Sequence, residues 1–218
     1  MKYMIPQNLA TLIHAVFQVS PELVSNSKHI SNVSELKYMN ERSFAYELYR
    51  QWQDVVDENE EGLVVNAEVA KRYEDEKFLG KLIEIFRLTK GGKPHRCFYP
   101  DLVLHHSQYN SEKQEIICEI KTMDGIDDKD NSRLGQDLKK LAAYMTENIL
   151  LYHPFKVGVF ILVGGDISEI ASRYESDNLV DKKKNEIYCI TYNVKQIEDN
   201  IYIPDVVCMS LNEILNKQ

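Results

Sequence analysis

The pattern of apolar and polar positions predicts a chain in which helices and strands alternate. Helical spacing of apolar residues predicts helices over residues 6–18, 41–56, 134–145, 166–176 and 211–217. Runs rich in β-branched residues, bounded by turn residues, predict strands over residues 62–69, 98–105, 115–122, 156–163, 186–192 and 201–209. Residues 82–88 fit a strand or a short helix, and residues 182–184 a basic turn. This order predicts an α/β protein with a mixed central β-sheet flanked by helices.

The same pattern indicates one main domain with an N-terminal addition. Residues 41–218 contain every predicted strand and form a single compact unit in this interpretation. Residues 1–40 carry one modest helical pattern and then a polar, serine-rich stretch. We expect them to form a helical cover on the sheet; a partner- or DNA-binding arm is the alternative.

Two of the predicted strands, residues 98–105 and 115–122, form a β-hairpin around the polar hexad Gln108–Lys113. Asn110 lies midway between Asp101 and Glu119, so a turn centred there sets these two acids opposite each other. Directly opposed residues lie about 4.5–5.5 Å apart. Because side chains alternate along a strand, Lys121 shares the face of Glu119. One patch thus carries two carboxylates and an ammonium group.

Two carboxylates that close repel each other, and a divalent cation relieves the repulsion. Oxygen-only ligands suit Mg²⁺, which binds one or two carboxylates together with water and phosphate oxygens. We therefore predict Mg²⁺ as the cofactor, with Mn²⁺ as its substitute. Lys121 could orient an attacking water or offset charge that builds on a phosphate.

The sequence Pro100-Asp101 followed by Glu119-Ile120-Lys121 resembles the motif of the PD-(D/E)xK nuclease superfamily, whose fold is called restriction-endonuclease-like. The resemblance covers roughly residues 40–165 and implies a core in the order α-β-β-β-α-β. It implies that Asp101 and Glu119 bind the metal with the backbone carbonyl of Ile120, and that Lys121 is catalytic.

The resemblance also implies that an acid on the first helix completes the metal site. We assign this role to Glu47, which lies at the edge of the apolar stripe of residues 41–56. The alternative is that Glu47 pairs with Arg50 or Ser43 on the helix surface. Glu41 and Glu68 are rivals for the same role.

Two groups of residues are candidates for binding nucleic acid. Residues 71–96 hold eight basic against four acidic residues, and Lys93 and Arg96 lead into the Pro-Asp strand. On the helix of residues 134–145, Lys140 and Tyr144 belong to a polar row that could face a phosphate. The alternatives are a solvated charged loop and an ordinary surface row with an Arg133–Asp137 ion pair.

Composition narrows the class of protein. A net charge of −8 over 218 residues argues against a general nucleic-acid coat protein, but it allows a nuclease with a local basic surface. The four cysteines are scattered, without a Cys-x-x-Cys pair, and read as reduced thiols. A signal peptide and a membrane span are not expected, which favours the cytoplasm.

We therefore expect a Mg²⁺-dependent, endonuclease-like hydrolase that cuts phosphodiester bonds, with DNA the favoured partner and a homodimer one arrangement typical of such enzymes. The alternative is a catalytically inactive nucleic-acid-binding or protein-interaction module on the same fold. A second dipeptide, Pro204-Asp205, has no Glu-x-Lys after it, and we expect it to have no catalytic role.

Overall fold

The computed structural model of the chain describes residues 5–23, 41–59, 62–67, 100–106, 113–123, 132–147, 149, 153–198 and 201–217. Its helices are α1 (Gln7–Gln18), α3 (Glu41–Asn59), α5 (Ser132–Tyr144), α6 (Ile167–Arg173), α7 (Asn178–Lys183) and α8 (Leu211–Leu215). Its strands are β1 (Leu63–Ala67), β2 (Leu102–His106), β3 (Gln114–Thr122), β4 (Val157–Val163), β5 (Ile187–Glu198) and β6 (Ile201–Ser210). Within these residues, no helix is both long and apolar enough to cross a membrane.

The strands form one six-stranded sheet in the order β1-β2-β3-β4-β5-β6. Strands β1, β2 and β3 are antiparallel neighbours, β3, β4 and β5 run parallel, and β6 returns antiparallel to β5. The α/β class and the mixed sheet predicted from the sequence are confirmed. The parallel pairs follow from helical connections, because a strand that follows a crossover helix enters the sheet parallel to the strand before it.

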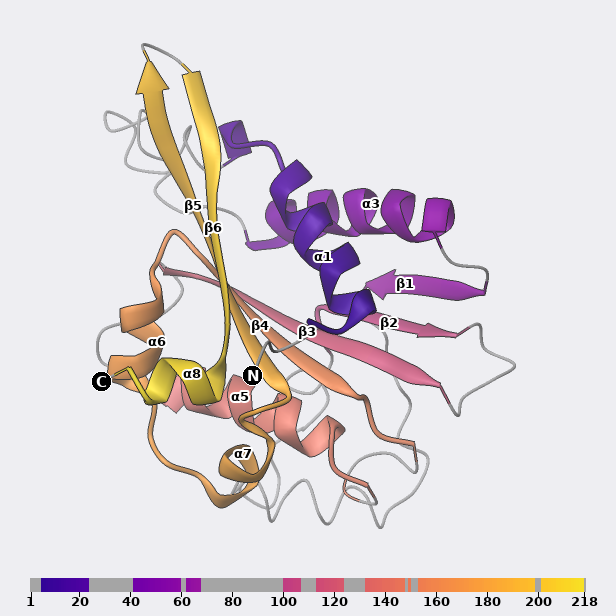
Figure 1. Ribbon diagram of the computed structural model, residues 1–218, viewed down its shortest axis with the longest axis vertical. Helices are drawn as coiled ribbons and strands as arrows, with labels where there is room; N and C mark the ends of the chain where they lie inside the picture. The colour runs from indigo at the N-terminus through magenta and orange to yellow at the C-terminus, as the bar shows by residue number, and fades with distance from the viewer. Residues whose placement is uncertain are drawn as a thin grey trace, which may run out of the picture.

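Helices cover both faces of this sheet (Figure 1). α1 and α3 lie on one face and bury Leu12 of α1 and Phe44 and Trp52 of α3 in a cluster with the even-numbered residues of β2 and β3. The apolar stripe of α3 ends in buried Val56. α5, α6, α7 and α8 pack on the other face.

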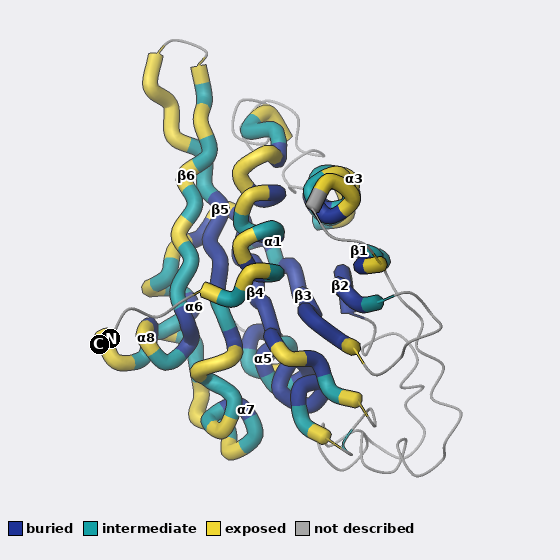
Figure 2. Tube along the Cα trace, turned by 45° about the vertical axis from the view of Figure 1, so that its right-hand side comes forward, coloured by how far each residue is buried: buried dark blue, intermediate teal, exposed yellow. Residues whose placement is uncertain are grey.

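Burial is greatest in the middle of the sheet and falls toward its ends (Figure 2). All seven residues of β4 are buried, as its continuous apolar run predicts for a strand covered on both faces. β5 extends to Glu198, beyond the predicted end at residue 192, and its last four residues are exposed. The residues expected to form a basic turn include Lys182 and Lys183, which end α7; its N-cap, Asp177, accepts hydrogen bonds from the backbone of Leu179 and Val180.

α1 is the described part of the predicted N-terminal cover. It packs against α3 and contributes Leu9, Leu12 and Val16 to the cluster on the sheet. The Trp52 indole donates a hydrogen bond to the Thr11 hydroxyl at 3.1 Å, which joins the two helices. Residues 24–40 lie outside the described residues.

Candidate active site

The end of the β2–β3 hairpin brings Asp101 beside the segment that contains Glu119. Leu102 pairs with Cys118 in the last regular pair, Asp101 directly precedes Leu102, and Glu119 directly follows Cys118. The Asp101 N–H donates to the Cys118 carbonyl at 3.1 Å, and its carboxylate accepts from the Ile120 N–H at 2.6 Å. Both the backbone N–H and the side chain of Asp101 are therefore hydrogen-bonded to the backbone of β3, so the hairpin fixes the position of this residue.

The register is regular only at this end of the hairpin. It shifts between Leu104 and His105, which pair with Ile116 and Gln114. A symmetric turn would have predicted Glu115 opposite His105. Asn110, the predicted centre of the turn, lies outside the described residues. Three regular pairs, from Leu102–Cys118 to Leu104–Ile116, separate this irregularity from the end of the hairpin next to Asp101 and Glu119.

Lys140 of α5 reaches the sheet and forms an ion pair with Glu119. Both side chains are buried, with exposed fractions of 8% for Lys140 and 1% for Glu119. Lys140 thus differs from the surface lysine that was expected to meet a phosphate. The cause is the rotation of α5, which turns the row containing Lys140 towards β3.

Two further acids, which the sequence did not place first, complete a compact charged group. Asp137, one turn before Lys140, lies 3.8 Å from the Lys140 ammonium and 3.7 Å from that of Lys121. Glu41, at the first position of α3, lies 3.6 Å from the Lys121 ammonium. We call the following six residues the charged cluster: Glu41, Asp101, Glu119, Lys121, Asp137 and Lys140. With all six ionised, its four carboxylates exceed its two ammonium groups by two charges.

Burial changes the proton affinity of Glu119, Asp101 and Glu41 in the charged cluster. Desolvation raises the pKa of Glu119 well above its usual range, although the Lys140 ammonium acts against it. Desolvation likewise raises the pKa of Asp101, against the hydrogen bond from Ile120, and that of Glu41, against Lys121. The site therefore disfavours the charged forms of these three carboxyl groups unless more positive charge is supplied.

The two lysines are held as ammonium groups. Burial acts to lower the pKa of Lys121, but the carboxylates of Asp137, Glu41, Asp101 and Glu119 outweigh it and the pKa is raised. The pKa of Lys140 is also raised, because its carboxylate neighbours outweigh its burial. A lysine with a raised pKa is protonated at neutral pH, so Lys121 acts as a cation and donor.

Two oxygens in the cluster are buried without a hydrogen-bond partner, Oε1 of Glu119 and Oδ2 of Asp137. An unpaired buried carboxylate oxygen is costly and calls for an explanation such as a bound ion or water. Across the described segments, however, no group of three or more His, Cys, Asp or Glu side chains is arranged to hold a metal ion.

The other predicted site residues lie elsewhere. The carboxylate of Glu47 accepts hydrogen bonds from Arg50 and Gln51 at 2.8 Å each and is not part of the cluster. Tyr144, expected beside a substrate, is fully buried and packs edge-to-face on Phe155. The predicted residues Lys93, Arg96 and Glu68 fall outside the described residues.

The sequence contained a partial signal for the two acids that join the cluster. Glu41 precedes the apolar stripe of α3 at the position where an acid favours a helix N-terminus, which explains it without a site. Asp137 lies three residues before Lys140 and was interpreted as a surface partner of Arg133. Spacing along the helix allows Asp137 to pair with either Arg133 or Lys140. Its contact with Lys121 of β3 becomes apparent only when α5 is packed on the sheet.

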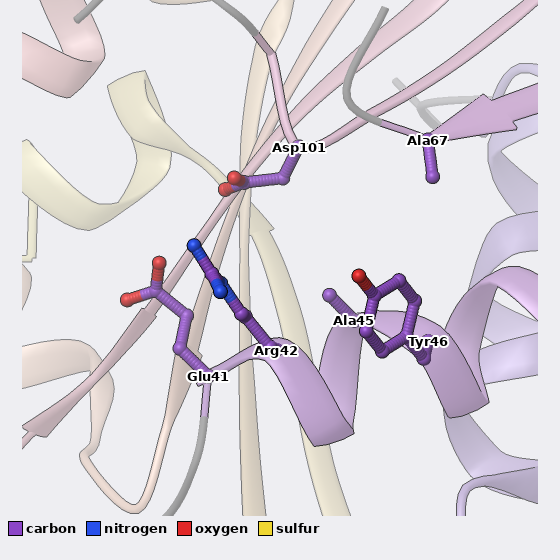
Figure 3. Close-up of a pocket in the computed structure, with 6 residues that line it drawn as sticks. All are labelled: Glu41, Arg42, Ala45, Tyr46, Ala67 and Asp101. Carbon is purple, nitrogen blue, oxygen red and sulfur yellow. The ribbon is translucent and has the colours of Figure 1, made fainter. Parts of the chain in front are cut away.

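A pocket opens beside the charged cluster, with a volume of about 190 Å³. Glu41 and Asp101 line it together with Arg42, Ala45, Tyr46 and Ala67. Figure 3 shows the Arg42 side chain reaching from α3 towards Asp101, with the Tyr46 ring further along the same helix. Glu41 and Asp101 belong to both the pocket and the charged cluster, so the pocket leads to the buried charges.

Comparisons with models of protein families, with curated proteins and with solved structures found no match for this chain.

Proposed function

We propose that this protein is a metal-dependent nuclease of the PD-(D/E)xK type that hydrolyses phosphodiester bonds, with DNA as the favoured substrate. The order α3-β1-β2-β3-α5-β4 agrees with the α-β-β-β-α-β core that the sequence resemblance implies. The proposal depends chiefly on one observation: the Asp101 carboxylate accepts the Ile120 N–H, between Glu119 and Lys121, at the end of a hairpin with a pocket alongside.

The charges and contacts of the cluster suit a divalent cation. Its carboxylates exceed its ammonium groups by two, and one Glu119 oxygen is buried without a partner. Hard oxygen ligands of this kind favour Mg²⁺ or Mn²⁺. Asp101, Glu119 and the Ile120 carbonyl would hold the ion, and Glu41 takes the helix-acid role first assigned to Glu47, because Glu41 lies beside Lys121 and lines the pocket.

Lys140 has a different role in this proposal from the phosphate contact suggested by the sequence. Its ammonium neutralises Glu119 in the protein without metal, which lowers the cost of burying that carboxylate. If a cation binds Glu119, the Lys140 ammonium has to give up part of its contact with that carboxylate. The Asp137 carboxylate, 3.8 Å from the same ammonium, can then pair with it.

Hydrolysis needs an attacking water, a polarised phosphate and a stabilised leaving oxygen. A bound divalent ion supplies Lewis acidity and a more acidic water. Lys121 supplies a fixed positive charge, because its pKa is raised by the surrounding carboxylates. It donates a hydrogen bond to the water or to a phosphate oxygen and offsets negative charge in the transition state.

The direct test is nicking of plasmid DNA in Mg²⁺ or Mn²⁺ by the wild type, Asp101→Ala and Lys121→Ala. Glu47→Ala is the matched control, since it removes an acid from α3 that lies outside the cluster. We expect both cluster variants to lose cleavage while their circular dichroism spectra stay native, and the control to cut like the wild type. Equal cutting by Lys121→Ala and the wild type would refute the catalytic assignment.

An inactive nucleic-acid-binding module on the same fold is the second candidate. The ion pair between Lys140 and Glu119 favours it, because it satisfies Glu119 in part without a metal. Calorimetric titration with Mn²⁺ separates the two functions. Heat of binding that disappears in Asp101→Ala supports the enzyme, whereas nucleic-acid binding without any metal binding supports the module.

A further inference from the structure

The pocket next to the charged cluster has an aromatic and a basic wall. Tyr46 is 58% exposed, the largest exposed fraction among the exposed large hydrophobic residues of the described chain. It lies one turn after Arg42 on α3, and both side chains line the pocket. An exposed tyrosine beside an arginine is not required by packing, since the buried stripe of α3 runs through Phe44 and Leu48.

The floor of this pocket is made of small side chains. Ala45 of α3 and Ala67 at the end of β1 line it, and both pack against the core beneath. In Figure 3, Ala67 and Tyr46 lie on the same side of the pocket, away from Glu41. Two methyl groups leave the space beside the Tyr46 ring open, where larger side chains would fill it.

The size of the pocket limits what can enter. Its volume of about 190 Å³ is smaller than the roughly 300 Å³ at which sites for drug-sized ligands begin. It has room for a single planar ring with its attached atoms. A nucleobase presents such a ring, and its face can stack on tyrosine.

From these observations we propose that the pocket binds one unpaired nucleotide, with its base stacked on Tyr46 and its phosphate held by Arg42. This inference rests on the proposed nuclease function and specifies its substrate as an unpaired strand. A base inside a duplex has neighbours on both faces, so its ring meets Tyr46 only where the strand is single or the base is turned out.

The position of Asp101 connects this pocket to the chemistry. Its carboxylate lines the pocket and accepts the Ile120 N–H in the cluster. A nucleotide whose base lies on Tyr46 therefore brings its phosphodiester to the metal ligands. Arg42 suits this task because a guanidinium group binds two phosphate oxygens at once.

Binding of short oligonucleotides, measured by fluorescence anisotropy with Ca²⁺ in place of Mg²⁺, tests the stacking. The ligands are a single-stranded DNA, an RNA of the same sequence and the DNA duplex. We expect Tyr46→Ala to weaken single-strand binding at least about fivefold, with a much smaller effect on the duplex. Tyr46→Phe keeps the ring and should bind like the wild type. Phe17→Ala, which removes another exposed ring, is the matched control.

An abasic site moved along the single strand makes the test specific to one base. In the wild type, one position should weaken binding when its base is missing, and in Tyr46→Ala that position should no longer matter. Arg42→Ala should weaken single-strand binding and reduce its salt dependence by about one phosphate contact, whereas Arg50→Ala, on the exposed side of the same helix, should do neither.

Failure of this inference differs from failure of the proposed function. If the wild type cuts nucleic acid but Tyr46→Ala and Phe17→Ala bind alike, with the same response to abasic sites, the nucleotide pocket is refuted and the nuclease stands. If the wild type neither binds nor cuts any of the ligands in Mg²⁺ or Mn²⁺, both are refuted.

Discussion

Two antiparallel strand pairs in this protein each contain a Pro-Asp dipeptide, in opposite surroundings. Asp101 directly precedes β2, accepts the Ile120 N–H of β3, and lines a pocket together with residues of α3. Asp205 lies in β6, opposite Asn193 of β5, and its side chain is exposed. In Figure 1 the far ends of β5 and β6 extend beyond the helices.

The difference shows what gives the dipeptide its chemistry. Asp101 acquires a raised pKa from burial and a fixed position from the Ile120 N–H. The strand opposite it supplies an acid and, two residues later, a lysine. Asp205 faces an amide and has Ile203 and Val207 as exposed neighbours on its face. The motif therefore acts through its partner strand, and the same two residues on β6 have no such partner.

The largest expected effect on stability comes from replacing one lysine in each region, Lys140 beside Glu119 and Lys195 in β5. Lys140→Met leaves buried Glu119 without its ion-pair partner and should lower the free energy of unfolding by about 3 kcal/mol. Lys195→Met, on the exposed end of β5, should change it by less than about 0.5 kcal/mol. Urea denaturation measures both.

The same pair of variants tests the metal. Mg²⁺ should stabilise Lys140→Met more than the wild type, because Glu119 then binds the ion without competition. A loss of stability no greater than that of Lys195→Met would show that Glu119 does not depend on Lys140.

The next effect concerns the two aspartates directly. Asp101→Asn keeps the size of the side chain but removes a proposed metal ligand, and we expect the rate of Mg²⁺-dependent cleavage to fall about 100- to 1,000-fold. Asp205→Asn should cut at the wild-type rate. Initial rates of plasmid nicking give the comparison, which fails if the two variants lose activity equally.

A smaller effect should appear in the pH dependence of stability. Because burial raises the pKa of Asp101, the folded protein keeps a proton that the unfolded chain loses near its ordinary pKa of about 3.9. The carboxyl group thus stabilises the fold at low pH, and this contribution is lost as the pH rises through the folded-state pKa.

Glu41 and Glu119 act in the same direction, since burial also raises the pKa of each. Asp101→Asn should therefore flatten, without abolishing, the fall in stability with rising pH, and Asp205→Asn should leave the slope as it is. Urea midpoints collected across the acidic range decide this. An Asp101→Asn slope as steep as that of the wild type contradicts the burial argument.

The smallest effect is expected at the exposed pair of strands. Ile203→Thr replaces a side chain that is 40% exposed, so the free energy of unfolding should change by less than about 0.5 kcal/mol. Val103→Thr in β2 buries a hydroxyl group in the hydrophobic core beneath α5 and should lower the free energy of unfolding by about 1–3 kcal/mol. Equal costs at the two positions would mean that β6 is covered in solution.

The sequence by itself determined which segments are helices and strands and which residues share a face of each. Period-two alternation and the residue count across the hairpin were enough to predict the register of Leu102 with Cys118, because an antiparallel register is a local property of two neighbouring strands. The apolar stripe of α3 and the continuous apolar run of β4 were likewise predicted from the sequence. The end of β5 and the short helix α7 were not, since neither has a long periodic pattern.

Only the tertiary structure decided which helical residues meet the hairpin. Periodicity shows which side of a helix is apolar, but not how far the helix slides or rotates on the sheet, and a shift of one turn exchanges one flanking residue for another. The position of α3 places Glu41, and not Glu47, beside Lys121. The rotation of α5 buries Tyr144 and turns Lys140 and Asp137 towards Glu119 and Lys121. These contacts join residues far apart in the chain, and they depend on the packing of the whole sheet.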